Sequence, residues 1–416
     1  MPSETHSSKL AIHGGAPVRT KPFPPRALFG PEEKAAVDEV LDEAIASGQA
    51  FGYGGPREQS YEKQLAEFLG GGFAKAVNSG TSAVLAAVAA LELEPGSEVV
   101  CPPITDPGGV MPVAMMNCIP VPADGDGFSF NAGPDQIAAA VTERTKAIVV
   151  AHIMGEPADM PAIADLARRR GVALIEDCAQ APGATLAGRQ VGTWGDLAAF
   201  STMSGKHFAT GAQGGVVFTR REDLFWKARR FMDRGKPFGT DQTSNVALGL
   251  NLNSNELAAA IGRVQLDKLP HTIERRRAVA ARIAEGIGPC RALSPGRILP
   301  QAEAVYWFMR LTVDEGSLSV SKDDFARAVA AEGIPVAASY RHMPSEHVWF
   351  RQRCTYGRSG YPWPAGGAHQ TCPALPNCEA AVAANFLLSI HENWGADEVA
   401  DAVAALVKVE QACLGR

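Results

Sequence analysis

The chain of 416 residues lacks the signatures of several common protein classes. Its eight cysteines form no CxxC pair and its nine histidines no HxxxH or HxxH pair, so we expect free thiols and no bound metal. No apolar run approaches the roughly 18 to 20 residues that span a bilayer. The net charge of −6, without a basic block, argues against nucleic acid as the main partner. The absence of a GxGxxG motif disfavours a dinucleotide.

The remaining composition is that of an ordinary globular protein. Hydrophobic residues make up 46% of the chain and charged residues 20%. The length exceeds that of one typical domain and suggests two. The first residues contain no basic stretch followed by an apolar core, so we expect no secretory signal and a cytoplasmic location.

Short apolar runs alternate with helical patterns through the first half of the chain. The runs are 98–104, 119–124, 147–153, 172–177, 196–202 and 214–219. Fully apolar strands that alternate with helices indicate a mostly parallel sheet covered on both faces. Ligands of such sheets bind at the carboxyl ends of the strands, which is where Asp177 falls.

The second half begins with a long helical pattern over 256–287, and a proline predicts a break or bend near Pro270. This segment leads from a large domain into a smaller one, which an amphipathic helix near the C-terminus closes. We therefore predict an N-terminal arm over 1–30, a large domain over 31–269 and a small domain over 270–416.

The stretch FSTMSGKHFATGAQGG places Lys206 in a glycine-bounded turn, and about thirty residues upstream the strand VALIED ends at Asp177. Pyridoxal phosphate (PLP) requires this pair, because a lysine holds its aldehyde as a Schiff base and an acid keeps its ring nitrogen protonated. A third segment, NSGTSA, leads from a short strand into a helix whose free N–H groups could cradle a phosphate. A lone lysine is usually a solvated surface residue, but the combination indicates an enzyme.

With these segments the chain resembles the DegT/DnrJ/EryC1/StrS aminotransferases, PLP enzymes that aminate keto-sugars and cyclitol ketones. The resemblance runs nearly end to end through NSGTSA, HIMGEPADM, EDCAQAPGA, FSTMSGK…GAQGG and LGLNLNSNELAAAIGRVQL. It implies an α/β, aspartate-aminotransferase-like PLP fold (fold type I). Such a fold has a large, mostly parallel sheet domain and a smaller C-terminal α+β domain.

The resemblance also assigns roles to single residues. Lys206 is implied to be the Schiff-base lysine and proton carrier, and Asp177 the partner of the pyridinium nitrogen. Gln180 matches a His or Gln close to the phenolic oxygen of the cofactor. The matches to phosphate-holding positions are Gly80, Thr81, Ser201 and Asn251. The last of these reaches the phosphate from the neighbouring subunit, which implies a homodimer with two shared sites.

Three positions depart from the family pattern. Asp106 stands where an aromatic residue commonly stacks on the cofactor, Asn253 where arginine is usual, and Glu156 where glutamine is common. Asp106 and Glu156 would favour a basic or polyhydroxylated acceptor, and the loss of the arginine affects donor or acceptor preference. Arg341 and His342 either line the entrance or serve a structural role.

The resemblance implies transfer of nitrogen from L-glutamate or L-glutamine to a cyclic keto-sugar or cyclitol ketone by a ping-pong cycle, in aminosugar or aminocyclitol biosynthesis of the antibiotic type. One alternative is a sugar dehydratase of the same fold. Such enzymes replace the lysine with histidine, whereas here Lys206 is retained and His207 merely follows it. Another alternative is a regulatory protein that binds PLP without turnover.

Overall fold

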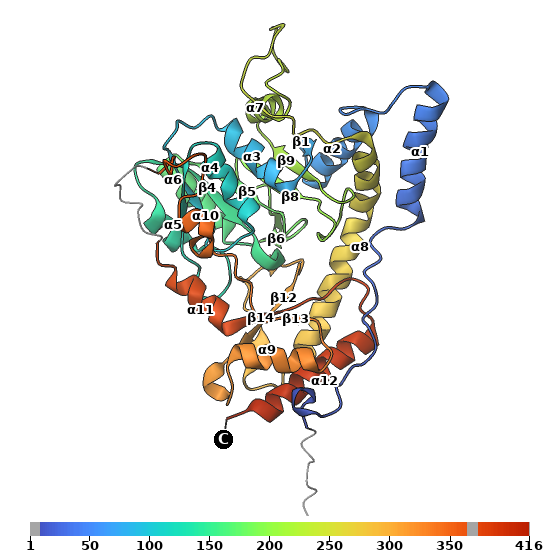
Figure 1. The fold of residues 1–416 in the computed structure, drawn as a ribbon, viewed down its shortest axis with the longest axis vertical. Helices are drawn as coiled ribbons and strands as arrows, with labels where there is room; N and C mark the ends of the chain where they lie inside the picture. Colours follow the sequence, from blue (N-terminus) through green and yellow to red (C-terminus); the bar gives the residue numbers. More distant parts are fainter. Residues whose placement is uncertain (1–8, 364–372, 416) are drawn as a thin grey trace, which may run out of the picture.

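The computed structural model describes residues 9–363 and 373–415, and a seven-stranded sheet lies in the upper half of the molecule in Figure 1. The strands, in sheet order, are β1 (Phe73–Val77), β9 (Gly215–Thr219), β8 (Leu197–Ser201), β5 (Ala173–Asp177), β4 (Thr145–Ala151), β2 (Glu98–Cys101) and β3 (Ile119–Pro122). The strand pairs from β8 to β3 are parallel, whereas β9 runs antiparallel to both β1 and β8. The prediction of a mostly parallel sheet is confirmed.

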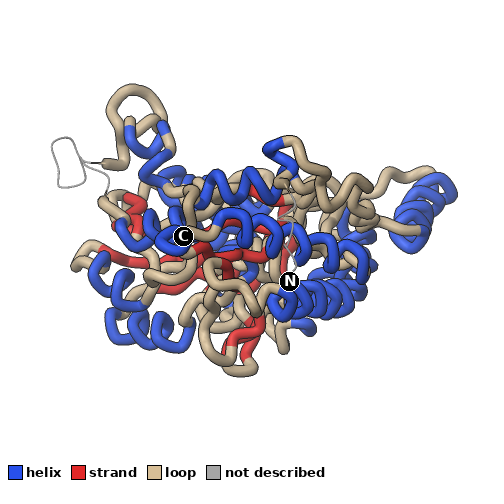
Figure 2. The backbone as a smooth tube through the Cα atoms, turned by 90° about the horizontal axis from the view of Figure 1, so that it is seen from below, coloured by secondary structure: helices blue, strands red, loops and turns tan. Residues whose placement is uncertain are grey.

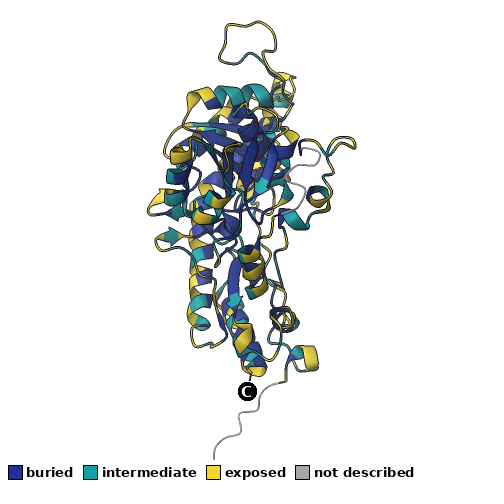
Figure 3. Cartoon of the chain, turned by 90° about the vertical axis from the view of Figure 1, so that its left-hand side faces the viewer, coloured by how far each residue is buried: buried dark blue, intermediate teal, exposed yellow. Residues whose placement is uncertain are grey.

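Helices cover both faces of this sheet, as Figure 2 shows from below. On β4, Val149 packs with the cluster of α3 (Gly80–Ala90) and α7 (Glu222–Met232), while its neighbour Val150 packs with that of α5 (Pro134–Ala140) and α6 (Met160–Arg170). Successive side chains of a strand point to opposite faces, so a run that is apolar throughout needs cover on both sides. The helix α2 (Pro56–Phe68) covers the same face of the sheet as α5 and α6. The buried strands lie between these layers in Figure 3.

A smaller antiparallel sheet, with the strand order β10-β12-β14-β13, forms the lower part of the molecule in Figure 1. Its elements are β10 (Leu293–Pro295), β12 (Met309–Val313), β14 (Asn385–Leu388) and β13 (Val336–Ala337), with α9 (Lys322–Ala331), α11 (Pro376–Ala384) and α12 (Ala396–Cys413). Phe325, Phe386 and Trp394 are fully buried in its core. A third, three-stranded sheet joins β11 (Ala302–Glu303), β6 (Thr185–Leu186) and β7 (Arg189–Gln190).

The helix α8 (Glu256–Gly286) connects the two larger sheets. Of the predicted break or bend near Pro270, the break does not occur, because the helix continues through this residue; the expected domain boundary at 269–270 falls inside one helix. Among the described residues, no helix combines the length and apolar character needed to cross a bilayer.

The N-terminal arm lies against the small sheet and its helices. Leu10 is buried in the core of this part of the molecule, and the N–H of Val18 donates to the carboxylate of Glu332 at 3.0 Å. Arg19 pairs with Glu398 at 2.8 Å and with Asp401 at 2.7 Å. The arm then passes to α1 (Pro31–Ser47), which lies beside α8.

Candidate active site

A cavity of about 270 Å³ opens where the parallel strands of the large sheet end. The predicted site residues that line it are Gly80, Thr81, Asp106, Asp177, Ser201 and Lys206. The structure brings them together because β5 and β8 are neighbours in the sheet and α3 begins directly after β1. The carboxyl ends of parallel strands meet at one edge, which is where ligands of such sheets bind.

Lys206 lies in the turn after β8 and is only 7% exposed. Its Nζ is 3.8 Å from the centre of the Trp307 ring, a distance at which an ammonium is attracted to the ring face. Burial lowers the pKa of Lys206 to about 8, although the negative charges of Asp177 and Asp106 favour the protonated form. The amine therefore has a substantial neutral fraction near pH 8.

Asp177 ends β5, and its side chain lines the cavity. Its Oδ1 accepts a hydrogen bond from the N–H of Ala179 at 3.0 Å. Burial raises the pKa of the carboxyl group, while this N–H and the charge of Lys206 lower it. Among the described residues we find no hydrogen bond to Oδ2, so this oxygen is open to a cationic partner.

The neighbours of Asp177 in the chain turn to the other face of the sheet and join His152 in a buried cluster. The carboxylate of Glu176 is 3.2 Å from His152 Nε2 and accepts backbone N–H groups of Gly192, Trp194 and Gly195. Burial holds the pKa of the Cys178 thiol well above its usual value. The N–H of Ala158 donates to His152 Nδ1 at 3.1 Å, so His152 and Glu176 already belong to a buried hydrogen-bond network.

The start of α3 forms a narrow cradle at one end of the cavity. Ser79 caps the helix by accepting a hydrogen bond from the N–H of Ser82 at 3.1 Å. At Gly80 a Cβ would come within 2.7 Å of the Cβ of Ser201, so glycine is required for the close approach of the helix to β8. The first N–H groups of the helix, together with Thr81 and Ser201, are placed to bind an anion.

Gln180 does not line the cavity, and its amide is held at both ends. Its Oε1 accepts the N–H of Met154 at 2.8 Å, and its Nε2 donates to the hydroxyl of Tyr340 at 3.1 Å. Met154 has a left-handed backbone with φ 61°, a conformation that residues other than glycine adopt only at some cost. Its carbonyl accepts the N–H of Trp307 at 2.9 Å, so one strained residue positions two site residues.

Sequence reasoning missed Trp307 and Tyr340, which come from the segments around the small sheet. The indole N–H of Trp307 donates to the carbonyl of Gly205 at 3.1 Å, and its ring covers Lys206. Neither residue belongs to a motif quoted for the family resemblance. A long-range contact of this kind leaves no local pattern in the sequence.

Glu156 does not line the cavity. Its carboxylate is buried against the guanidinium of Arg310, with Nη2 and Oε2 separated by 2.9 Å. Its expected contact with substrate has no support in this arrangement, and we assign Glu156 a structural role.

Asn251 and Asn253 also lie outside the cavity of their own chain. They are joined to each other by a side-chain hydrogen bond of 2.8 Å, and Asn253 lies opposite Val77 at the end of β1. Asn251 is exposed, which leaves its amide accessible to another molecule.

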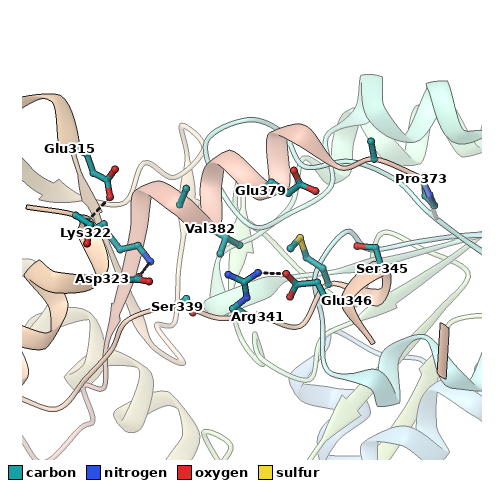
Figure 4. A pocket seen from close by; sticks show the side chains of 14 residues that line it. Glu315, Lys322, Asp323, Ser339, Arg341, Ser345, Glu346, Pro373, Glu379 and Val382 are labelled. Atoms are coloured by element: carbon teal, nitrogen blue, oxygen red, sulfur yellow. Dashed lines mark hydrogen bonds and ion pairs between the residues drawn. The ribbon is translucent and has the colours of Figure 1, made fainter. Parts of the chain in front are cut away.

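Arg341 lines a second, larger cavity of about 710 Å³, where it pairs with Glu346 (Figure 4). The ring of His342 lies 4.6 Å from that of Tyr340. Its carbonyl accepts the N–H of Thr105 at 3.0 Å and so holds the loop that carries Asp106. Neither residue lines the cavity of Lys206.

Comparison with known proteins gives a consistent result. The model of the DegT/DnrJ/EryC1/StrS aminotransferase family matches residues 31–406. An L-glutamine:2-deoxy-scyllo-inosose aminotransferase of Micromonospora echinospora is 34% identical, over 84% of this chain and 86% of its own. A protein of the same description from Streptomyces fradiae is 31% identical over 97% of both. The X-ray structure of an aminotransferase from Psychrobacter cryohalolentis is 29% identical with a TM-score of 0.80, covering 92% of this chain and 98% of the other.

Proposed function

The chain belongs to the DegT/DnrJ/EryC1/StrS aminotransferase family, and we propose that it transfers an amino group from L-glutamine or L-glutamate to a ketone carbon of a cyclitol or cyclic keto-sugar. The observation that carries the proposal is a buried Lys206 of lowered pKa that shares one cavity with Asp177 and the start of α3. The names of the two curated relatives favour L-glutamine as the donor and a cyclitol ketone as the acceptor. The reaction would take place in the cytoplasm, in aminosugar or aminocyclitol biosynthesis.

The cavity fits pyridoxal 5′-phosphate as the cofactor. Asp177 is a buried carboxylate with one oxygen that accepts no hydrogen bond from the described part of the chain, which suits a cationic ring nitrogen. Gly80, Thr81 and Ser201 would hold the phosphate, and Gln180 is fixed for a polar group of the ring. When bound, the cofactor supplies an aldehyde that carries the amino group and a protonated ring that takes up electrons from the donor.

The residues of the chain would supply proton transfer, exclusion of water and contact with the substrate. In the first half-reaction the neutral amine of Lys206 would accept a proton from the α-carbon of the donor, and in the second its ammonium form would donate a proton to the acceptor carbon; a pKa of about 8 suits both directions. Trp307 covers this amine and excludes water from it. Asp106 lies across the cavity and could contact an amine or hydroxyl group of the substrate.

We also propose a homodimer with shared sites, in which Asn251 of one subunit reaches the phosphate of the other. Large apolar side chains are exposed on α1 and on the two loops near Asn251, namely Leu41, Ile45, Phe51, Tyr53, Val246, Leu248 and Leu250. Such a concentration of exposed apolar residues is typical of a protein interface. Mixing a Lys206→Ala variant with an Asn251→Ala variant should restore activity through heterodimers that have one intact site, whereas a monomer would show no such rescue.

The visible absorption of the purified protein tests the proposal. We expect a band from bound PLP that bleaches with L-glutamine and returns with 2-deoxy-scyllo-inosose, the ketone named for both relatives. Initial rates at varied donor and acceptor should give the parallel lines of a ping-pong reaction.

Other outcomes would favour the alternatives. A nitrogen-free product would indicate a dehydratase, although His207 is fully buried and donates to the carbonyl of Val305 rather than facing the cavity. A band that no donor changes would indicate a regulatory protein. Absence of the band after reconstitution would refute the assignment of Lys206 and Asp177.

A further inference from the structure

Arg26 of the N-terminal arm contacts the backbone that carries the central lysine. Its two terminal nitrogens donate to the carbonyl of Lys206 and, at 2.8 Å, to the carbonyl of His207. Its third nitrogen, Nε, pairs with Glu392 at 2.7 Å. One guanidinium therefore joins the arm, the turn after β8 and the segment before α12.

The contacts continue through Glu392 to a second arginine. The other oxygen of Glu392 pairs with Arg276 of α8 at 2.8 Å, and the side chain of Arg276 is only 3% exposed. Arg276 donates in turn to the carbonyls of Tyr306 at 2.8 Å and Trp307 at 3.3 Å. We call Arg26, Glu392 and Arg276 the arginine clasp.

Both ends of the arginine clasp reach groups that meet in the cavity. One end holds the backbone of Lys206 and the other the backbone of Trp307, and the side chains of these two residues are in contact. Charge-assisted hydrogen bonds are shorter and stronger than neutral ones, and the planar guanidinium fixes the direction of each bond. The arginine clasp thus connects the backbone position of Lys206 to that of Trp307.

We propose that Arg26 is a positioning residue for Lys206: the N-terminal arm is a strap that holds the amine under the indole ring. This inference rests on the proposed role of Lys206 in amino transfer. Displacement of a reacting group by about 1 Å can lower a rate by about 100-fold, so a positioning contact outside the cavity has a large effect on turnover.

The charged groups around Lys206 and Arg26 determine in which direction the pKa of Lys206 changes when Arg26 is lost. Asp177 and Asp106 face Lys206, and burial is the main reason for its lowered pKa. Arg26 faces Glu392, Arg276 and His391, as well as His207, whose pKa burial holds well below its usual value. Loss of Arg26 would free the turn and admit water to Lys206, so the pKa of the lysine would rise toward its ordinary value.

The variants are Arg26→Ala, the conservative Arg26→Lys and the control Arg19→Ala. Arg19 is the matched control because it is a buried arginine of the same arm that pairs with Glu398 and Asp401 and makes no contact with the cavity. The full-length, cofactor-free protein is treated with trace acetic anhydride across pH 6–10, and acetylation of the Lys206 peptide is followed by mass spectrometry.

For Arg26→Ala we expect the labelling pKa to rise by about one unit from its value near 8, which lowers the labelling rate at pH 8 by roughly fivefold. Arg26→Lys should recover part of the shift, and Arg19→Ala should leave the profile unchanged while lowering the melting temperature. In the PLP-loaded enzyme, kcat for Arg26→Ala should fall by about tenfold or more with little change in donor KM.

An unchanged labelling profile in Arg26→Ala, or an equal shift in Arg19→Ala, would overturn the proposal and leave the clasp a purely structural feature. Failure of the proposed function has a different signature. Labelling of Lys206 in the parent protein that PLP does not block would refute the role of the lysine itself, whatever Arg26 does.

Discussion

The pairing of Glu156 with Arg310 leads to a prediction that separates a structural role from a substrate contact. Glu156 follows β4 in the large domain, and Arg310 belongs to β12 of the small sheet. The guanidinium has no exposed area, and it also donates to the carbonyl of Phe128 at 2.8 Å and to Asn385 Oδ1 at 3.0 Å. Burial raises the pKa of Glu156 even though the charge of Arg310 lowers it, so the ionised pair is kept at a cost in desolvation.

We predict that Glu156→Gln destabilises the protein by about 3 kcal/mol, because removal of one partner leaves a buried charge uncompensated. This figure is at the lower end of the usual range of about 3–5 kcal/mol, since the amide keeps an acceptor for Arg310 and removes the burial cost of the carboxylate. For a chain of 416 residues the entropy of unfolding makes this a loss of about 3 °C in melting temperature.

Calorimetry would compare the melting temperature of Glu156→Gln with that of a control variant, Glu346→Gln. Glu346 pairs with Arg341, but this arginine side chain is 64% exposed, so its loss should cost less than about 1 kcal/mol and about 1 °C. We expect the KM for the acceptor to be unchanged in Glu156→Gln. An unaltered melting temperature together with a raised acceptor KM would refute the reasoning and restore Glu156 as a substrate contact.

Three further predictions concern the cavity. Asp106→Asn removes a negative charge that favours protonated Lys206, so the labelling pKa of the lysine should fall below about 8; an unchanged acceptor KM would exclude Asp106 from the acceptor site. Tyr340→Phe leaves the amide of Gln180 without its partner at 3.1 Å, which should cost about 1–3 kcal/mol in unfolding free energy or, if the amide turns into the cavity, weaken PLP binding. Gly80→Ala forces Ser201 to move and should lower PLP affinity by about tenfold or more, whereas Gly52→Ala, which meets only open space, should not; equal affinities in a titration would show that the cradle does not bind the phosphate.

The sheet and the central pair of the site could be predicted because their signals are local. Each apolar run is buried on both faces, as the alternation of Val149 and Val150 shows, and this is the pattern of a covered parallel strand. Asp177 ends one such strand, and Lys206 follows another. The order of strands in the sheet, which the sequence patterns do not specify, then makes the two residues neighbours.

Glu156 shows where a local signal misleads. The motif HIMGEPADM lies at the correct edge of the sheet, and the carbonyl and N–H of Met154 do hold Trp307 and Gln180. The left-handed turn at Met154 and Gly155 redirects the chain, and the next side chain points away from the cavity toward Arg310. Its direction depends on backbone angles that the residue types alone do not specify.

Trp307, Tyr340 and Arg26 could not have been predicted, because none lies in a recognised motif and each reaches the site only through a contact across more than a hundred residues of chain. Their positions depend on how the arm and the small sheet pack on the large domain. The helix α8, unbroken at Pro270, sets that packing and also supplies Arg276 to the arginine clasp.

The site is divided between the large domain and the segments around the small sheet, and this division has a chemical consequence. The large domain supplies Lys206, but the lowered pKa of the amine comes first from burial, and Trp307 of the small-sheet segment provides part of that cover. Any movement that lifts the indole would hydrate the amine and raise its pKa from about 8 toward its ordinary value, which would lower its neutral fraction. If Lys206 acts as the proposed base, its neutral fraction depends on how the small-sheet segment packs on the large domain, and the arginine clasp links that packing to the backbone of the lysine.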